Sequence, residues 1–483
     1  MHPTSLPGNY GVGTLGKQAY KFVELLHKAG QKWWQVLPLT PTGFGHSPYQ
    51  CYSAFAGNPF LIDLDFLEEK GWLTKEEANF TINNPKIADF DSARDHLHSA
   101  LPKAFKRFIK EGGKEKEQFE LFCKEEESWL DDYSLFRALK DQFNQKSWWE
   151  WEPGLKNRDK GTLGFYTNLC ADQIEYRKFL QYLTLSQWKG VKDYANSLGI
   201  QIIGDIPIYV SWDSADVWVN PELFLLDEKG YPTHIAGVPP DYFSETGQLW
   251  GNPVFNWKKH HETNFNWWKK RVSVTLKNVD LIRLDHFRGF ESFWSVPYGE
   301  ETAIKGEWVL GLGRELFESL TDEFGDLPFI AEDLGVITKE VEILRDDFKL
   351  PGMKILQFAF DSGEENDFLP HNYEKKSVVY TGTHDNDTLL GWLATSSKED
   401  RKFALNYLNG KEETIVWDFI RSAWASTSVL AITTMQDIVE EGTESRMNMP
   451  GTTEGNWSWR FTWDDVEEKN IEQLKKLTTV YGR

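Results

Sequence analysis

The amino-acid sequence predicts a fold of the α/β class, a (β/α)8 barrel with insertions over the carboxyl ends of its strands. Seven apolar, β-rich runs bounded by turn residues are typical of buried strands. These runs lie at 32–39, 200–210, 280–287, 328–335, 353–360, 377–385 and 428–435. Amphipathic helical patterns, such as Gly16 to Gly30, lie between several of them, and this alternation indicates a parallel sheet. Because no Gly-rich phosphate loop follows a strand, a barrel is favoured over an open nucleotide-binding sheet.

Two intervals between the predicted strands are too long to be simple crossovers. The interval from about 40 to 198 carries charged helical stretches, which predict inserted helical subdomains with solvated faces. The interval 211–265 is rich in Pro, Gly, Asp and Trp and predicts an ordered, loop-like region. We expect one domain over residues 1–483, with both insertions over the strand ends, where barrels build their sites.

The overall composition argues against several classes of protein. A formal net charge of −21 argues against a nucleic-acid backbone as partner. No run of about eighteen apolar residues is present to span a membrane. The start, MHPTSLPGNYG, has neither a basic nor an apolar signal segment, so a cytoplasmic location is expected. Cys51, Cys123 and Cys170 lie far apart without a C-x-x-C pair, so neither a disulfide framework nor a zinc site is indicated.

Aromatic residues make up 15% of the chain and include 22 Trp. Several occur in pairs, at Trp33-Trp34, Trp148-Trp149 and Trp267-Trp268. Most such rings pack in cores, whereas an exposed ring offers a flat surface to the C–H face of a sugar. Composition alone leaves both interpretations open.

The run LIRLDHFRG ends a predicted strand, and catalytic groups converge at the carboxyl ends of barrel strands. Arg283 and Asp285 are two residues apart, so they project to the same side of a strand. A guanidinium beside a carboxylate favours the charged form. We therefore expect Asp285 to stay ionised, as a nucleophile must; the alternative is a buried ion pair that only fixes the strand.

The run FIAEDLG places two acids, Glu332 and Asp333, after three apolar residues. Glu332 shares a side of the strand with Ile330, and Asp333 is opposite, so one acid should face the mouth of the barrel. Apolar neighbours keep a carboxyl protonated towards neutral pH, which suits a general acid for a glycosidic oxygen. The alternative is a glutamate bonded to a loop or a helix N-terminus.

The run TGTHDNDT gathers His384, Asp385, Asn386 and Asp387 at another strand end. One histidine with scattered acids lacks the spacing of a known zinc or facial-triad motif, so a clamp for sugar hydroxyls is favoured over a metal site. In that interpretation Asp385 bonds two ring hydroxyls, and these bonds strengthen as charge develops on the sugar.

A fourth strand acid, Asp205 in IIGDIPIYV, lies between Gly204 and Pro207, where it could simply cap a bend. Together the strand ends supply a nucleophile, an acid and a hydroxyl clamp. This is the set that glycoside chemistry requires, two carboxylates flanking the scissile bond with polar binding groups around it.

Further stretches extend this pattern along essentially the whole chain. They are HPTSLPG (2–8), SPYQ and AFAGNP (47–59), IIGDIPIYVSWDSADVW (202–218), GVPPDYFSETGQLWGNP (237–253), RLDHFRG (283–289), AEDLG (331–335), TGTHDNDT (381–388) and NMPGTTEGNW (448–457). In combination they closely resemble the 4-α-glucanotransferases known as amylomaltase or disproportionating enzyme, glycoside hydrolase family 77.

The resemblance implies Asp285 as nucleophile, Glu332 as acid/base and Asp385 as transition-state stabiliser. It also implies a set of substrate-binding residues: Tyr49 stacking on the glucose at the cleavage subsite, Arg283 and His384 lining that subsite, Asp205 contacting its hydroxyls, and Gln248 and Trp250 in a loop that covers the acceptor side. Relatives carry a short apolar strand before HPTSLP, where this chain has only Met1. The first barrel strand is therefore expected to be truncated or missing.

The expected reaction is a retaining double displacement on malto-oligosaccharides and α-1,4-glucans, with glucose or another glucan as acceptor and without a metal or organic cofactor. No nucleic-acid or membrane partner is expected. Three alternatives stay open: an α-glucan hydrolase with the same carboxylates, a catalytically silent glucan-binding protein, and a metal-dependent barrel hydrolase.

Overall fold

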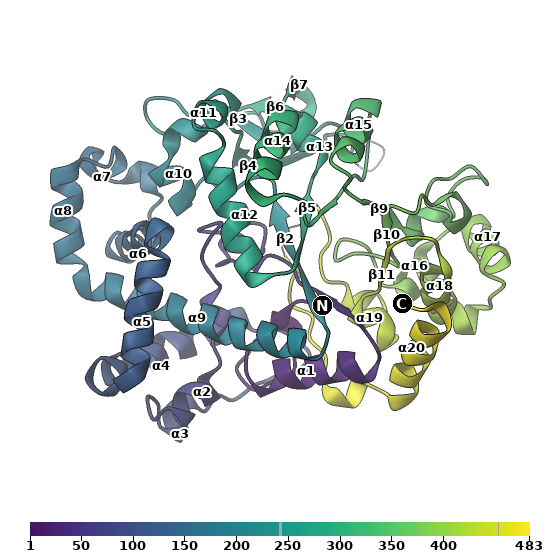
Figure 1. The fold of residues 1–483 in the computed structure, drawn as a ribbon, viewed down its shortest axis with the longest axis horizontal. Coiled ribbons are helices and arrows are strands. Elements are labelled where there is room, and N and C mark those ends of the chain that lie inside the picture. Colours follow the sequence, from purple (N-terminus) through teal and green to yellow (C-terminus); the bar gives the residue numbers. More distant parts are fainter. Residues whose placement is uncertain (241–243, 453) are drawn as a thin grey trace.

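The seven predicted strands form one parallel sheet in the order β1-β2-β5-β8-β9-β10-β11 (Figure 1). The structure is a computed structural model and describes residues 1–240, 244–452 and 454–483. The strands are β1 Trp33–Gln35, β2 Gln201–Pro207, β5 Leu281–Asp285, β8 Phe329–Ala331, β9 Gly352–Ile355, β10 Ser377–Tyr380 and β11 Leu430–Ile432. Six of the seven lie within runs that the sequence predicted, and β9 begins one residue before its run at 353–360, so the strand predictions are confirmed.

The sheet curls so that its two ends approach each other. The Tyr380 hydroxyl on β10 donates a hydrogen bond of 2.9 Å to Gln35 Oε1 on β1, at the opposite end of the strand order. Buried side chains fill the interior of the curl, among them Ile203, Ile330 and Ile355. The architecture is that of a (β/α)8 barrel that lacks one strand, as predicted.

The missing position lies between β1 and β11, the two ends of the sheet. A cavity of about 290 Å³ lies there, lined by residues of both strands and by Met1. The Met1 ammonium donates to Gln35 O at 3.0 Å, and the Trp34 indole N–H donates to Met1 O at 2.7 Å. The first residue is thus bonded alongside β1, where the sequence expected a truncated strand.

Helices cover the outside of the sheet and occupy the long interval between β1 and β2 (Figure 1). The predicted first helix is confirmed as α1, which buries Ala19, Phe22 and Val23. In chain order the helices are α1 Lys17–Lys28, α2 Leu64–Glu69, α3 Lys75–Ala78, α4 Phe90–Glu111, α5 Gly113–Glu125, α6 Glu127–Gln142, α7 Pro153–Lys156, α8 Lys160–Leu169, α9 Ala171–Ser197, α10 Ala215–Val219, α11 Trp257–Glu262, α12 Asn266–Asn278, α13 Arg288–Glu291, α14 Gly313–Phe324, α15 Lys339–Asp347, α16 Leu389–Thr395, α17 Lys398–Leu408, α18 Ile415–Ala425, α19 Met435–Ile438 and α20 Glu468–Tyr481.

A second, antiparallel sheet was not predicted from the sequence. It has the order β4-β3-β6-β7, with β3 His234–Val238, β4 Gln248–Pro253, β6 Ser292–Pro297 and β7 Glu307–Leu310. Gly and Pro break the strand pattern of β4, and β3 pairs with β6 across the intervening α11, α12 and β5, so tertiary contacts rather than local propensity form this sheet. It brings β4 towards the carboxyl ends of the barrel strands, beside β5.

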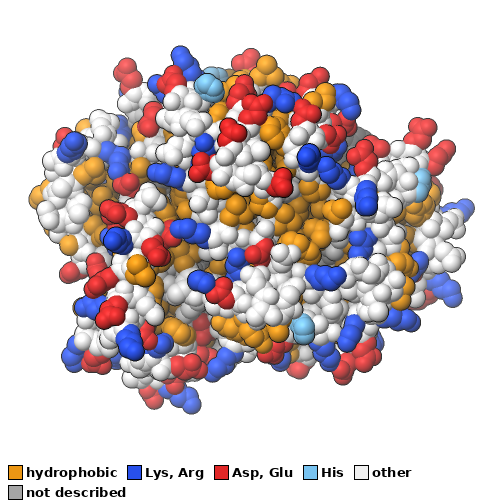
Figure 2. Space-filling view, in the orientation of Figure 1, with side chains coloured by type: hydrophobic (Ala, Val, Ile, Leu, Met, Phe, Trp, Pro, Cys, Tyr) orange, Lys and Arg blue, Asp and Glu red, His pale blue; other side chains and the backbone are white. Residues whose placement is uncertain are grey.

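The surface carries charges of both signs. On the face seen in Figure 2, Lys and Arg side chains lie among Asp and Glu, with hydrophobic side chains between them. None of the helices in the described ranges is both long and apolar enough to cross a membrane.

Candidate active site

The register of three neighbouring strands gathers four charged side chains, which we name the strand-end cluster: Asp205, Arg283, Asp285 and Glu332. Asp205 on β2 pairs with Arg283 on β5, and Leu284 pairs with Ala331 on β8. Continuing this register by one residue sets Asp285 beside Glu332. In-register residues of parallel strands project to the same side, so the two carboxyls face the same space.

Arg283 lies at the centre of the strand-end cluster. Its Nη1 donates to both carboxylate oxygens of Asp205 at 2.9 Å and to Asp285 Oδ1 at 2.8 Å. The Asp205 side chain is fully buried, whereas that of Asp285 is 27% exposed. Burial opposes the charge of Arg283, but the two aspartates outweigh it and hold its pKa well above the usual value. The guanidinium therefore stays charged, and Asp285 is open to solvent.

Glu332 is held by backbone groups rather than by a cation. Its Oε2 accepts from the His286 N–H at 2.6 Å, and its Oε1 accepts from the Leu334 N–H at 3.1 Å. Burial, opposed by Arg283 and reinforced by the charge of Asp285, raises the pKa of Glu332 to about 8. The carboxyl thus keeps its proton at neutral pH, in the direction that the apolar run FIA suggested.

His286 delivers its N–H through an unusual backbone conformation. Its φ is +53°, in the left-handed region that few residues other than Gly adopt. Strain of this kind is concentrated at functional sites. The Trp250 ring and the His286 imidazole form a T-shaped pair, with centroids 4.8 Å apart at 88°.

The other acid of the AEDLG run, Asp333, has a structural role. It accepts from Arg345 Nη1 at 2.6 Å and from the Met353 N–H at 2.7 Å. These bonds tie the end of β8 to β9 and α15. Of the two acids that the sequence left as candidates for the barrel mouth, Glu332 is therefore the one in the site.

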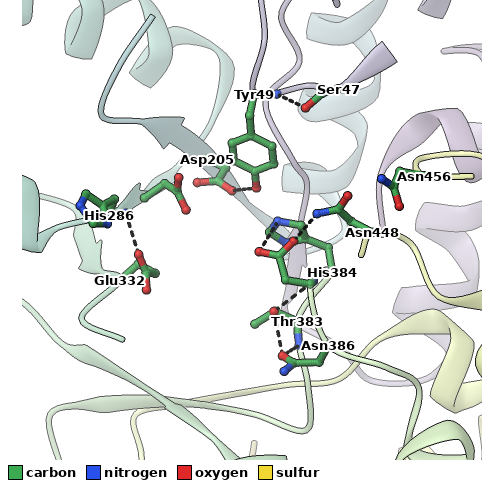
Figure 3. A network of polar contacts seen from close by, with 12 residues as sticks. Ser47, Tyr49, Asp205, His286, Glu332, Thr383, His384, Asn386, Asn448 and Asn456 are labelled. Atoms are coloured by element: carbon green, nitrogen blue, oxygen red, sulfur yellow. Dashed lines mark hydrogen bonds and ion pairs between the residues drawn. The ribbon is translucent and has the colours of Figure 1, made fainter. Parts of the chain in front are cut away.

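Opposite the strand-end cluster is a loop-held side made of Tyr49, His384, Asp385 and Asn448. Figure 3 shows Tyr49, His384 and Asn448 together, with Glu332 and His286 facing them. Tyr49 comes from the loop after β1, and its hydroxyl donates to Asp205 Oδ2 at 2.7 Å. Its ring stacks on His384, with centroids 5.2 Å apart at 14°. His384 Nε2 lies 3.4 Å from Asp385 Oδ2, and the Asp385 side chain is 43% exposed. A continuous series of contacts thus joins the strand-end cluster to Asp385.

Three residues of the loop after α19 belong to this site but were not identified from the sequence. Asn448 Nδ2 donates to Asp385 Oδ1 at 2.6 Å, and Arg446 Nη2 donates to the Asp385 backbone carbonyl at 2.5 Å. The buried Trp457 ring lies 5.9 Å from the rings of both Tyr49 and His384. The stretch NMPGTTEGNW, one of those that carry the family resemblance, contains two of these three residues and could have pointed to them.

Gln248 and Trp250, the residues expected on the acceptor side, lie at the start of β4. The Trp250 indole N–H donates to Gln248 Oε1 at 3.2 Å, and Gln50 Nε2 donates to Trp250 O at 3.3 Å. Trp250 contacts both His286 and Gln50, so Gln248 and Trp250 border the site on the side of Asp285. Residues 241–243 of the same predicted loop lie outside the described part of the chain.

All nine expected site residues therefore lie in one connected region. For Asp205 the contacts indicate a positioning role, because its carboxylate is buried against Arg283 and Tyr49. A direct hydrogen bond between Asp205 and a sugar hydroxyl stays a prediction. It would require Asp205 to lose a hydrogen bond to Arg283 or Tyr49.

Comparisons with known proteins agree along the whole chain. The profile of the glycoside hydrolase 77 family, described as 4-alpha-glucanotransferase, matches residues 1–465. The 4-alpha-glucanotransferase of Clostridium butyricum is 48% identical over 489 residues, covering 100% of both chains. That of Thermus thermophilus is 46% identical over 492 residues, covering 100% of this chain and 98% of its own.

A solved structure gives the same result for the fold. The amylomaltase from Streptococcus agalactiae in complex with acarbose superposes with a TM-score of 0.97 at 42% identity, covering 100% of this chain and 98% of that one. The amylomaltase from Corynebacterium glutamicum, at 16% identity and a TM-score of 0.79, shares the fold. This chain belongs to the glycoside hydrolase 77 family of 4-alpha-glucanotransferases.

Proposed function

We propose that this protein transfers segments of α-1,4-glucans to the 4-hydroxyl of an acceptor glucan or glucose by a retaining double displacement. Asp285 is the nucleophile, Glu332 the acid/base and Asp385 the transition-state stabiliser. One observation supports these roles above all others: a partly exposed aspartate bonded to an arginine lies beside a buried carboxyl that keeps its proton. A nucleophilic carboxylate beside a protonated acid is the arrangement that glycoside cleavage needs.

The strand register supports retention of configuration. Neighbouring strands lie about 4.8 Å apart, and Asp285 and Glu332 extend from neighbouring strands at the same level. Retaining enzymes separate their two carboxyls by about 5–5.5 Å, whereas inverting enzymes need about 6.5–9.5 Å to admit a water between them. Side chains that start one strand apart fit the shorter range.

In the first half of the reaction, a carboxylate oxygen of Asp285 forms a bond to the anomeric carbon. The glycosidic C–O bond breaks, and the Glu332 proton passes to the departing 4-oxygen, leaving a glucosyl ester on Asp285 and an ionised Glu332. Arg283 Nη1 donates to Asp285 Oδ1 at 2.8 Å and so holds the nucleophile in position. Asp385 accepts hydrogen bonds from ring hydroxyls that become more acidic as charge develops on the sugar.

In the second half, Glu332 takes the proton from the 4-hydroxyl of the acceptor. The acceptor oxygen attacks the anomeric carbon, the ester bond to Asp285 breaks, and both carboxyls return to their starting states. Transfer to a sugar instead of water requires groups that bind the acceptor and exclude water. Trp250 packs against His286, the residue after Asp285, and is hydrogen-bonded to Gln248, so both are placed for this task.

The comparisons do not favour the hydrolase alternative, because the full-length relatives are named as transferases. We propose that residues 1–483 form a single catalytic domain in which the insertions at about 40–198 and 211–265 shape the glucan site. Glucose as acceptor and the cytoplasmic location stay predictions from the sequence.

Incubation of the purified protein with maltotriose tests the proposed function. Transfer yields glucose together with chains longer than maltotriose, and the number of glycosidic bonds stays constant. If all products are shorter than maltotriose and the number of reducing ends rises to match, the reaction is hydrolysis and the proposed transfer is wrong.

A further inference from the structure

A cluster of partly exposed aromatic rings lies beside the site but takes no part in the proposed chemistry. We name it the outer aromatic surface: Trp149, Trp212, Tyr231 and Tyr298. The rings of Trp149 and Trp212 stack with centroids 3.5 Å apart at 8°. Tyr231 and Tyr298 pack edge-on against Trp212, at 5.4 and 5.6 Å, and lie 6.1 Å from each other. Tyr298 is 46% exposed.

Buried polar groups hold this surface in one arrangement. Lys140, itself 1% exposed, donates to Asp213 Oδ2 at 2.5 Å and to the carbonyls of Gln145 and Lys146. The Trp148 backbone N–H donates to Asp213 Oδ1 at 3.3 Å, and its indole N–H donates to Trp212 O at 2.8 Å. These bonds join the segment that carries Trp149 to the segment that carries Trp212, some 60 residues later.

A third segment is fixed to the same unit at Gly230. The Trp212 indole N–H donates to Gly230 O at 3.0 Å. Gly230 has a φ of +85°, and a Cβ there would lie 2.8 Å from the Trp148 ring. Only glycine satisfies both conditions, so Tyr231 is brought against Trp212 by a turn that other residues would open.

The outer aromatic surface is continuous with the acceptor side of the site. Ser211, next to Trp212, donates through its hydroxyl to Gln50 Oε1 at 2.9 Å. Gln50 follows Tyr49 in the chain and donates to Trp250 O. Asn252 on β4 donates to Val210 O at 2.9 Å, which binds the same loop from the other side. The loop that carries Trp212 is therefore bonded to the segments that carry Tyr49 and Trp250.

We propose that the outer aromatic surface binds the acceptor α-1,4-glucan at glucose units beyond those at the reaction centre. The proposal rests on the proposed function. Rigid, partly exposed indole and phenol rings match the C–H faces of pyranose rings at little cost in conformational entropy. Because the surface lies outside the reaction centre, it selects for long acceptors and leaves short ones unaffected.

Amylose binding tests this proposal without relying on turnover. In an Asp285→Asn background, where the glucan is not consumed, affinity electrophoresis through amylose should retard the parent protein. Trp149→Ala and Tyr298→Ala should each weaken this retardation about threefold to tenfold, the range expected for loss of one aromatic contact. Tyr481→Ala, which removes a 38% exposed ring at the end of α20, is the matched control. Dextran, an α-1,6-glucan, should retard none of them.

A kinetic measurement separates this proposal from the proposed function. With Asp285 restored, the two variants should raise the KM for amylose as acceptor severalfold and leave maltotriose disproportionation unchanged. Unchanged amylose binding and KM in folded Tyr298→Ala, with full maltotriose transfer, would overturn the proposal and leave the function intact. Failure of the parent protein to lengthen maltotriose would instead refute the function. Tyr298→Ala keeps the test decisive if Trp149→Ala unfolds, because Tyr298 is largely exposed.

Discussion

The two halves of the site are built in different ways. The strand-end cluster consists of side chains on three neighbouring strands, locked by strand register and by Arg283, with Asp205 fully buried. The loop-held side places Asp385 five residues beyond the end of β10, 43% exposed, with Asn448 of a distant loop as its hydrogen-bond donor. Groups that form and break bonds are thus on the rigid sheet, and the group that grips the sugar is on loops.

This difference has a physical reason. The covalent step requires Asp285 and Glu332 to keep a fixed separation, which the strand register provides. It also requires Glu332 to keep its proton, which burial of this carboxyl provides. A sugar clamp must open for a chain to enter and leave, and loops at the mouth of a barrel allow this. The comparison predicts that substitutions in the strand-end cluster abolish chemistry, whereas those on the loop-held side reduce it.

The largest effect is expected for Asp285→Asn, which removes the nucleophile. We expect kcat for maltotriose disproportionation to fall on the order of 10⁴-fold or more, measured as initial glucose release. Asp280→Asn is the matched control, because Asp280 precedes the same strand at its other end and pairs with Lys192 at 3.1 Å. Substitutions at that end of a barrel affect stability rather than catalysis. Substantial activity in Asp285→Asn would remove the assignment.

Glu332→Gln should cost less and should depend on the donor. With a glucan donor, loss of the general acid lowers the rate by about 10²–10⁴-fold. With α-maltosyl fluoride the loss in the first half-reaction should be much smaller, because fluoride departs without a proton. An equal loss with both donors would argue against the acid role.

The pH profile gives a second check on Glu332. Its pKa of about 8 means that the acid is protonated below this pH and ionised above it. We therefore expect kcat/KM, which reports the pKa values of the free protein, to fall as pH rises through about 8, and the Gln variant to lack this limb. A profile flat from pH 7 to 10 in the parent protein would contradict the assignment.

On the loop-held side, Asn448→Ala should reduce kcat by about 10–100-fold, the value of one hydrogen bond to a charged group. Because the Asp385 bonds to sugar strengthen in the transition state, KM should change less than kcat. Met449→Ala, at the next and 46% exposed position, is the control and should retain activity. A rise in KM with kcat unchanged would show that Asn448 binds substrate rather than positions Asp385.

The sequence predicted the barrel strands and the candidate site residues, but not how these residues pair. Buried strands appeared as apolar runs because a parallel sheet is covered on both faces, and acids after such runs were conspicuous. Strand register could not be read from the runs, and a slip of one residue would turn Asp285 away from Glu332. The pairing of Asp385 with Asn448, 63 residues later, joins two loops without any periodic pattern, so only the fold reveals it.

Asp333 and Glu332 show that even for adjacent residues the local sequence does not determine which side chain faces the site. Both acids follow the same apolar run, and alternation along a strand places them on opposite sides. Which side faces the site depends on where Arg345 and the Met353 N–H lie, and both come from later elements. Local sequence thus limited the candidates to two, and tertiary contacts decided between them.

The smallest expected effect is on stability and again separates the two halves of the site. Glu332 has a folded-state pKa of about 8, above its ordinary value of 4.5. The folded protein therefore holds this proton more tightly than the unfolded chain does, and the contribution of Glu332 to stability falls as pH rises from 4.5 to 8. Glu332→Gln removes this dependence, so its Tm should exceed that of the parent by roughly 1–4 °C at pH 8 and by less at pH 5.

Asp385→Asn should leave Tm nearly unchanged at both pH values, because water already solvates a side chain that is 43% exposed. Equal Tm shifts for the two variants, measured by thermal unfolding at both pH values, would mean that burial does not distinguish the sheet-held carboxyl from the loop-held one.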